Sequence, residues 1–359
     1  MISSTGFFGA ENVVSQLSGA LSVLGHRVSI GVISDGREPV WPTQGKMPVT
    51  FFPCRGKFDP GTIAAIRRYM REKSIAVVNT HNYKSDMYGW LASIGTDARK
   101  VATCHNWITR GPKMRIYESI DKGLLRLFDA VIAVSPALHE EIAKSGISPM
   151  KIRTIPNGIG FSGKTAEKDR LRLRQENCIE AGIKAVLSVG RLSREKGHDV
   201  LLRAFAALIR EGRQLKLIVV GEGGQRAMLE ELSERLGLKG QVVFTGFRND
   251  VRMFLDSCDI FVLPSFTEAM PMALVEALSA GIPVVATKVG AVPDILQEGK
   301  YGLLTSPGDP DGMAAAIRNI LADPASAADR AEKGRRHCRN TMSSRRMAQE
   351  YARVYSGHG

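Results

Sequence analysis

Short runs of apolar residues alternate with longer amphipathic segments along nearly the whole chain, and this alternation is its most constraining feature. Strands are predicted at residues 28–33, 49–52, 76–79, 101–103 and 131–134, and again at 185–189, 216–220, 242–245, 260–263, 284–287 and 301–304. Helices are predicted at 12–24, 61–73, 200–210, 225–236, 271–279 and 312–321. Strands joined through helices form parallel sheets, so the pattern indicates an α/β protein that binds its ligands at the carboxyl ends of the strands.

The alternation falls into two blocks, which suits the 359-residue length. The turn Ile155-Pro156-Asn157-Gly158 closes the first block, and a charged run at 164–174 predicts a linker or an exposed helix. We therefore expect one Rossmann-like domain at 1–161, a second at 162–340 and a C-terminal helix at 341–359. Because only Met1 to Ser4 precede the first Gly-rich turn, we also expect the native chain to start upstream, with its first strand truncated here.

Composition excludes several classes of protein. With 44% hydrophobic and 24% charged residues, the chain has globular averages rather than those of a disordered protein. There is no apolar run of about 18 residues that would span a membrane, and the first residues lack a secretory signal pattern. The five scattered cysteines form neither a disulfide framework nor a CxxC metal pair, so a reducing cytoplasm is expected.

The formal net charge of +13 is unevenly distributed. Residues 1–161 carry +8, residues 162–329 carry −1, and the tail 330–359 carries +6. Nucleic acid, an anionic membrane surface or phosphorylated small molecules would each suit such an excess, and a solvated surface without a partner is the ordinary alternative.

The segment from Pro264 to Pro283 follows an apolar strand and predicts a helix with Pro271 in its first turn. The amides of Met270, Met272 and Ala273 would then face the ligand crevice, as suits a phosphate or a sugar hydroxyl. Glu268 precedes the helix and Glu276 lies two turns into it, where a carboxylate could accept both hydroxyls of a ribose. Alternatively, Glu268 stabilises the helix N-terminus and Glu276 is a surface residue.

A second polar turn, Gly190-Arg191-Leu192-Ser193-Arg194-Glu195-Lys196-Gly197-His198, follows the strand at 185–189. Gly190 permits close backbone approach, and Arg191 and Lys196 supply cations at the strand end that a diphosphate with developing charge requires. The ordinary alternative is a solvated basic loop.

Together these two segments resemble the C-terminal domain of family 4 glycosyltransferases of the GT-B fold, in which two Rossmann-like domains face each other across a cleft. The resemblance extends from Gly6 to about Leu321, with its specific residues at 188–192, Lys196-Gly197, Gly221-Glu222-Gly223, Pro264-Ser265 and Glu268-x7-Glu276. It implies a retaining transferase that uses a nucleotide sugar. The implied donor-binding residues are Arg191 and Lys196 on the diphosphate, Glu276 on the ribose, Glu268 on the donor sugar, and the backbone of Met270, Pro271 and Met272.

The resemblance also covers the first domain. Gly6 to Glu11 is similar to the Gly-rich loop that closes over the donor phosphates, with Gly9 as its donor contact. His105 matches the family histidine beside the transferred carbon and is our catalytic candidate together with Glu268. We assign His81 and Lys84, which follow the strand at 76–79, to the acceptor side. Cys104 is expected to be a packing residue.

Two residues depart from the family pattern: Ala269 replaces the usual Gly after Glu268, and Gly160 replaces the common acidic residue after Asn157-Gly158-Ile159. Neither change removes a charged donor contact. The sequence holds no Asp-x-Asp at a strand end and no metal-spaced cluster, so no metal and no other cofactor is expected if Arg191 and Lys196 neutralise the diphosphate. The cations and helix amides would favour departure of the nucleoside diphosphate while the acceptor hydroxyl attacks from the same face.

The basic stretch at 109–126 is amphipathic, and the tail resembles the family's last helix, which crosses back to the first domain. If both belong to one lobe, they predict peripheral attachment to the inner membrane surface, near a glycan or lipid-linked acceptor. A soluble acceptor is the alternative.

We therefore interpret the chain as a glycosyltransferase that uses a UDP- or GDP-linked sugar, in cell-surface polysaccharide or glycolipid synthesis. Three rivals remain. A nucleotide-sugar epimerase or phosphorylase of the same fold would need acid/base carboxylates or a cofactor lysine that the sequence does not display. A nucleic-acid-binding protein would need more aromatic platforms than 6% aromatic residues provide. A sugar-nucleotide-binding relic without turnover is disfavoured by the intact charged residues.

Overall fold

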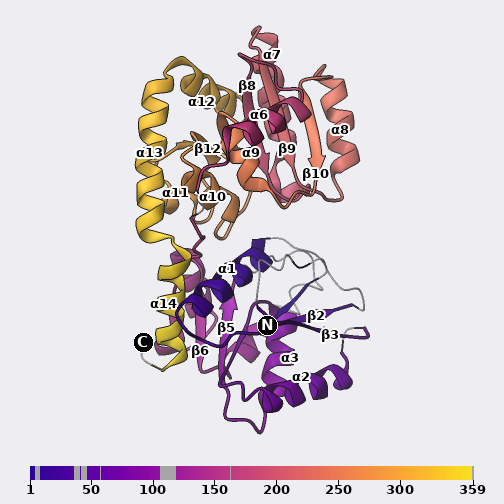
Figure 1. Ribbon diagram of the computed structural model, residues 1–359, viewed down its shortest axis with the longest axis vertical. Coiled ribbons are helices and arrows are strands. Elements are labelled where there is room, and N and C mark those ends of the chain that lie inside the picture. The colour runs from indigo at the N-terminus through magenta and orange to yellow at the C-terminus, as the bar shows by residue number, and fades with distance from the viewer. Residues whose placement is uncertain are drawn as a thin grey trace. The chain divides into compact units, whose positions relative to one another are not determined.

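A computed structural model of the protein describes residues 1–4, 9–35, 41, 47–56, 58–105, 119–161 and 163–357 (Figure 1). The chain forms two compact units. Unit 1 comprises Met1–Gly160 and Met342–Gly359, and unit 2 comprises Phe161–Thr341. These boundaries lie one residue from those expected between the two domains and before the C-terminal helix.

Unit 1 contains two parallel sheets in its described part. The first has the order β1-β2-β3, with β1 at Ile2–Ser3, β2 at Ile30–Ser34 and β3 at Val49–Pro53. The second has the order β4-β5-β6-β7, with β4 at Val77–Thr80, β5 at Arg99–Cys104, β6 at Ala130–Ala133 and β7 at Ile152–Thr154. The Met1 amino group donates to the Asn79 carbonyl oxygen of β4. The strand β7 was not predicted, because its three residues carry Arg153 and Thr154 and so lack an apolar run.

The helices of unit 1 include α1 (Gly9–Val23), α2 (Pro60–Glu72), α3 (Tyr83–Ser93), α5 (Pro136–Lys144) and α14 (Ser344–Tyr355). The last four begin at polar caps that the sequence provides: Asp59, Asn82, Ser135 and Ser343. At α3, Asn82 accepts from the Ser85 amide at 3.1 Å, and the Ser85 hydroxyl accepts from the amides of Asn82 and His81. This capping box holds the turn that follows β4, and therefore the backbone of His81.

Unit 2 is built on one six-stranded parallel sheet with the order β10-β9-β8-β11-β12-β13. Its strands are β8 (Lys184–Val189), β9 (Leu215–Val220), β10 (Val242–Gly246), β11 (Ile260–Leu263), β12 (Val284–Thr287) and β13 (Leu303–Thr305). Its helices are α6 (Glu167–Glu176), α7 (His198–Arg210), α8 (Arg226–Arg235), α9 (Val251–Ser257), α10 (Met272–Ala280), α11 (Val292–Ile295), α12 (Pro310–Ala322) and α13 (Pro324–Thr341). The strand order reverses between β8 and β11, and such a switch point is where doubly wound sheets bind ligands.

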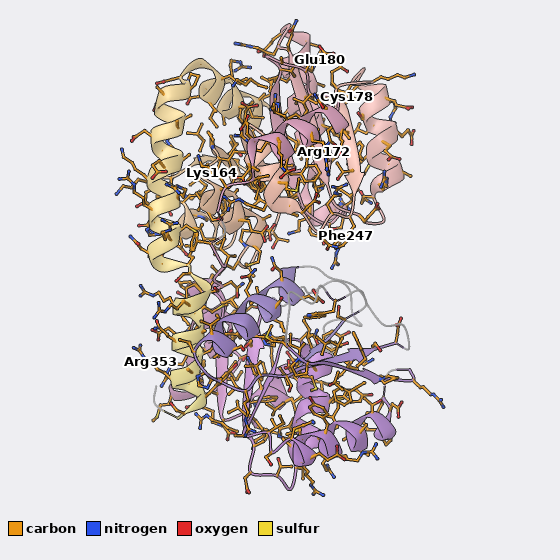
Figure 2. The ribbon with its side chains drawn as sticks, viewed as in Figure 1. Lys164, Arg172, Cys178, Glu180, Phe247 and Arg353 are labelled. Carbon is orange, nitrogen blue, oxygen red and sulfur yellow. The ribbon has the colours of Figure 1, made fainter. Side chains whose placement is uncertain are left out.

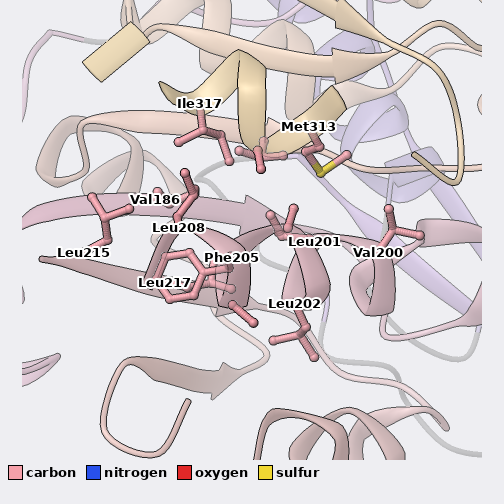
Figure 3. Close-up of a cluster of buried hydrophobic side chains, with 14 of the residues drawn as sticks. Val186, Val200, Leu201, Leu202, Phe205, Leu208, Leu215, Leu217, Met313 and Ile317 are labelled. Atoms are coloured by element: carbon pink, nitrogen blue, oxygen red, sulfur yellow. The ribbon is translucent and has the colours of Figure 1, made fainter. Parts of the chain in front are cut away.

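A fully buried cluster holds α7 and α12 against this sheet (Figure 3). Phe205 and Leu208 of α7 and Ile317 of α12 are 0% exposed, as are Val186 of β8 and Leu217 of β9. Burying side chains of this size stabilises a fold by about 1.5–3 kcal/mol each. The cluster therefore provides a rigid base for the loops at the carboxyl ends of β8 and β11.

The last helix belongs to unit 1, where α14 packs against α1 (Figure 1). Of the basic tail residues, Arg345, Arg346 and Arg353 lie on α14, and Arg353 is exposed (Figure 2). The expectation that the whole basic tail belongs to one lobe was wrong, because Arg335, Arg336 and Arg339 lie on α13 of unit 2. Two of these three pair with the carboxylate of Glu332 at 2.7 and 2.9 Å.

The backbone at the end of the first part of unit 1, just before residue 161, pairs with the backbone at the start of its second part, just after residue 341. Ile159 donates to the Met342 carbonyl at 3.0 Å and accepts from the Ser344 amide at 2.8 Å. Gly158 lies so close that a Cβ atom there would be 2.5 Å from the Ser343 carbonyl oxygen. A glycine is therefore required for this pairing, which anchors α14 to the rest of unit 1.

Replacing Gly158 with alanine should destabilise unit 1, because the added methyl group meets backbone atoms that cannot rotate away. Overpacking of this kind costs about 1–3 kcal/mol. Thermal unfolding should show a lower Tm for Gly158→Ala, whereas Gly163→Ala should be neutral because nothing lies within 4 Å of its Cβ position. Equal melting curves for both variants would contradict the pairing.

Candidate functional site

A glycine in the loop after β8 allows that loop to pack closely against the loop after β11. Gly197 has φ +64°, and a Cβ atom there would lie 2.1 Å from the Pro264 carbonyl oxygen. The Phe266 amide donates to the Glu195 carbonyl at 2.8 Å and joins the two loops on the other side of Gly197. These contacts bring together the two polar segments predicted from the sequence, at the switch point of the sheet.

An ion pair joins the same two loops. Lys196 Nζ lies 2.6 Å from Glu268 Oε1, and the Ser265 hydroxyl donates to that oxygen at 2.7 Å. The Glu268 side chain is only 8% exposed and that of Lys196 25% exposed. A buried carboxylate is stable only when charge and hydrogen bonds compensate its lost hydration, and Lys196 and Ser265 supply both.

The backbone of Glu268 is held from the side of β12. Gly290 has φ +51°, and a Cβ atom there would be 1.6 Å from the Glu268 carbonyl oxygen. The Ala291 amide donates to the Ala269 carbonyl at 3.2 Å. Glu268 is thus fixed through its side chain and its main chain, as a group that must meet a ligand in one geometry requires.

Helix α10 starts one residue later than predicted, at Met272. Pro271 is the N-cap, in an extended conformation with ψ 111°, and is not in the first turn. Its carbonyl oxygen accepts from the Leu274 and Val275 amides, and the side chains of Met270 and Met272 are buried. The helix therefore directs its first amides toward the edge of the sheet that also carries Lys196.

Two further predicted donor residues of unit 2 follow the same two strands. Glu276 is half-buried in the second turn of α10, and Arg191 is exposed two residues beyond β8. The Leu192 amide donates to the Glu222 carbonyl at 2.9 Å, which fixes the backbone next to Arg191. Gly223 permits this approach, since a Cβ atom there would be 2.3 Å from the Leu192 carbonyl oxygen.

His198, which begins α7, was not predicted as a site residue. It is 3% exposed and lies behind Gly190, where a Cβ atom would be 3.8 Å from the imidazole Cε1. Burial, helped by the nearby charge of Lys196, lowers the pKa of His198 to about 4, so the ring is neutral. Within the described ranges its Nδ1 has no hydrogen-bond partner. The sequence signal that could have identified His198 is its position directly after Gly197 at the end of the polar turn.

In unit 1, two predicted residues lie in direct contact. His81 Nδ1 is 3.0 Å from His105 Nε2, and the rings stack with centroids 5.3 Å apart. Burial lowers the pKa of His105 to about 4 and that of His81 well below its usual value. Lys84 does not join them, because its ammonium group lies 5.9 Å from the ring centroid of Tyr88 and 3.5 Å from the Gly56 carbonyl oxygen.

Unit 1 also contains a buried acidic group. Asp86 is 3% exposed, and burial together with Asp121 raises its pKa well above the usual value. Burial likewise raises the pKa of the Cys104 thiol, so Cys104 is a thiol within the sheet, as expected of a packing residue. Across the part of the chain that is described, no group of three or more His, Cys, Asp or Glu side chains could hold a metal ion.

Several sequence predictions lie wholly or partly outside the described residues. Gly9 begins α1, with open space around its Cβ position, but residues 6–8 of the Gly-rich loop are not described. Residues 109–118 of the basic stretch are likewise outside, which leaves only its end at 119–126. No helix among the described residues combines the length and apolar character of a membrane span.

Gly290→Ala should displace Glu268, because the new methyl group would collide with its carbonyl oxygen in a backbone conformation that alanine disfavours. Strain at positive φ and overpacking together cost about 2–4 kcal/mol. We expect a lower Tm in calorimetry, while Gly224→Ala should match the wild type because its Cβ position is open and its φ is not positive. An unchanged Tm in Gly290→Ala would contradict the close packing of the Glu268 loop.

Two family models match the two halves of the chain. Residues 8–161 match the model described as Glycosyltransferase Family 4, and residues 169–337 match Glycosyl transferases group 1. The chain is 30% identical over 339 residues to a component of the phosphatidylinositol N-acetylglucosaminyltransferase of Arabidopsis thaliana, covering 88% of this chain and 72% of that one. It is 32% identical over 206 residues to the lipopolysaccharide core biosynthesis glycosyltransferase LpsE of Rhizobium meliloti, covering 57% and 58%.

Solved structures agree with these relatives. The crystal structure of Anabaena HepE in complex with UDP and glucose matches with a TM-score of 0.87 and 25% identity over 99% of both chains. WaaG, described as a glycosyltransferase involved in lipopolysaccharide biosynthesis, shares the fold with a TM-score of 0.76 and 21% identity, over 99% of both chains. The family, the fold and the enzyme class expected from the sequence are thereby confirmed: the chain belongs to the family 4 glycosyltransferases and is an enzyme of the GT-B fold.

Proposed function

We propose that this glycosyltransferase takes a sugar from a UDP- or GDP-linked donor and transfers it, with retention and without a metal ion, to a glycan or a lipid-linked acceptor. The observation that carries the proposal is the Lys196–Glu268 ion pair at the switch point of unit 2. It places a cation beside a buried carboxylate at the edge where parallel sheets bind ligands. The complex of HepE with UDP and glucose supports a nucleotide-sugar donor.

The charged groups of this edge define the proposed roles. Arg191 and Lys196 would neutralise the charge that develops on the departing diphosphate, and the first amides of α10 would add to this field. Glu276 would accept hydrogen bonds from the ribose, and Glu268 from a hydroxyl of the donor sugar. With two cations at the diphosphate, the acceptor hydroxyl can attack from the face that the leaving group vacates and lose its proton to the leaving phosphate.

The names of the relatives support the choice of acceptor. The Rhizobium meliloti relative is named for lipopolysaccharide core biosynthesis, and the Arabidopsis thaliana relative is named for transfer to phosphatidylinositol. Both names describe an acceptor that contains a lipid. A role in cell-surface polysaccharide or glycolipid synthesis is therefore the version of the proposal that we favour.

Donor binding should be measured first by thermal shift with UDP, GDP, ADP and their sugar conjugates, with EDTA present. A ligand at 100 times its Kd stabilises the folded protein by about 2.7 kcal/mol. We expect a clear rise in Tm for one nucleotide. Arg191→Ala and Glu276→Ala should weaken binding about 10–100-fold, which corresponds to lost charged hydrogen bonds of about 1.5–3 kcal/mol.

Matched controls exist on the far faces of unit 2. Arg203 on α7 and Glu234 on α8 are exposed, so Arg203→Ala and Glu234→Ala should bind the nucleotide like the wild type. Product analysis with the preferred donor then separates transfer from epimerisation, since an epimerase returns an altered nucleotide sugar without an acceptor. Absence of any nucleotide-dependent shift would overturn the proposed donor class, and dependence on a divalent metal would overturn the metal-free version.

We infer in addition that unit 1 associates peripherally with an anionic membrane. The side chains of Ile120 and Leu127 are 58% and 51% exposed at the described end of the basic stretch. The same segment contributes to a recess of about 380 Å³ lined by seven residues: Ser119, Lys122, Gly123, Arg126, Glu141, Lys144 and Ser145. Exposed apolar side chains next to lysine and arginine are the combination that binds a lipid headgroup layer.

Sedimentation with vesicles tests this association. The wild type should bind vesicles that contain phosphatidylglycerol and ignore phosphatidylcholine alone, with binding weakened by salt. Lys122→Glu with Lys144→Glu should reduce binding about 30-fold or more, since each basic group near the surface contributes about 1 kcal/mol. The control pair Lys168→Glu and Lys239→Glu makes the same charge change at exposed positions of unit 2. Equal losses of vesicle binding in the two double variants would show that net charge alone controls binding, and would contradict binding through this particular surface of unit 1.

A further inference from the structure

The hydrogen bond between His81 and His105 restricts where their protons lie. Its two nitrogens are 3.0 Å apart, so one carries a hydrogen and the other offers a lone pair. Burial lowers the pKa of both rings, that of His105 to about 4, so both are neutral at neutral pH. The pair therefore has two arrangements, which differ in the ring that donates.

Asn79 on β4 selects between these arrangements. Its Oδ1 accepts from the Thr103 hydroxyl at 3.0 Å, which leaves Nδ2 as the donor. Nδ2 donates to the Tyr355 hydroxyl at 2.8 Å and faces His81 Nε2 at 3.2 Å. His81 Nε2 is thus the acceptor, so His81 carries its hydrogen on Nδ1 and donates it to His105 Nε2.

The orientation of Asn79 is held by groups from distant parts of the chain. Thr103 lies on β5, and its hydroxyl is 3.3 Å from that of Tyr351. Tyr351 and Tyr355 both come from α14, with Tyr351 0% exposed. Burial raises the pKa of both phenols, so their hydroxyl groups keep their hydrogens. The last helix of the chain thereby contributes to the order of the histidine pair.

We propose that Asn79 and His81 are positioning residues that hold His105 in its Nδ1–H tautomer. In this state His105 Nε2 accepts from His81, and Nδ1 can only donate, so the ring has no lone pair with which to act as a general base. His105 then serves as a hydrogen-bond donor to a hydroxyl oxygen of a sugar substrate. Only this choice of ligand rests on the proposed function. His81, assigned to the acceptor side from the sequence, acts through His105 instead.

The tautomer can be read directly by two-dimensional NMR of protein labelled with ¹⁵N-histidine, through the couplings of ring nitrogens to ring hydrogens. Loss of one spin system in His105→Gln assigns the signals among the seven histidines. The wild type should show His105 as neutral with its hydrogen on Nδ1. A His105 that is protonated at neutral pH, or that carries its hydrogen on Nε2, would overturn the proposal.

Two substitutions separate the hydrogen bond from the space that the ring fills. His81→Phe keeps a stacked ring without a donor, so His105 should shift toward the Nε2–H tautomer that free histidine favours. His81→Asn can place an amide N–H where Nδ1 was and should retain the Nδ1–H tautomer. The control is His139→Phe. His139 forms a hydrogen bond with Thr154 in the same unit, and its replacement should leave the His105 signals unchanged. An unshifted His105 in a folded His81→Phe protein would also count against the proposal.

Kinetics connect the tautomer to catalysis once a donor is known. His81→Phe should lower kcat about 10–100-fold with little change in the donor KM, as expected when a hydrogen bond made mainly in the transition state is lost. His81→Asn should recover much of that loss. If no donor is ever found, the NMR result still decides the tautomer, so failure of the proposed function and failure of this inference are distinguishable.

Discussion

Parallel pairing of strands is the constraint on which both units depend. In a parallel sheet every strand ends at the same edge, so polar residues that follow different strands are gathered there. In unit 2 this edge carries Lys196 after β8 and Glu268 after β11, which are 72 residues apart in the sequence and 2.6 Å apart in space. In unit 1 the same geometry brings together His81 after β4 and His105 after β5. The apolar cores beneath serve chiefly to hold these edges rigid.

The strand-end edges of the two units differ in their charge, because their buried polar side chains have different partners. In unit 2 a buried carboxylate is balanced by a lysine, and a further arginine is exposed nearby in sequence, so the edge carries formal charge suited to phosphate. In unit 1 burial is the main cause of the lowered pKa of both histidines and keeps the rings neutral. A neutral pair in a network of amide and hydroxyl groups is suited to hydroxyl groups of a sugar.

Much of this arrangement could be predicted from local patterns. The edge of unit 2 that we propose binds the donor could be predicted from two segments, the strand at 185–189 with its following turn and the segment from Pro264 to Pro283. In both, cations, carboxylates and glycines cluster directly after apolar runs. The start of α10 was predicted to within one residue. The error at Pro271 arose because proline is typical of the first helical position, whereas here it is the N-cap. The strand β7 escaped notice because it is short and partly polar.

The sequence by itself determined the class of fold, the two-unit organisation and the residue types at the strand ends, because periodicity and the positions of glycine and proline are local properties. Tertiary structure alone decided which side chains meet. It placed Gly290 against the Glu268 backbone, buried His198 behind Gly190, and made His81 a partner of His105. It also brought Tyr355 from α14 to Asn79, 276 residues away in the chain. Such contacts depend on packing between distant segments, and so do the pKa values and tautomers that burial imposes on them.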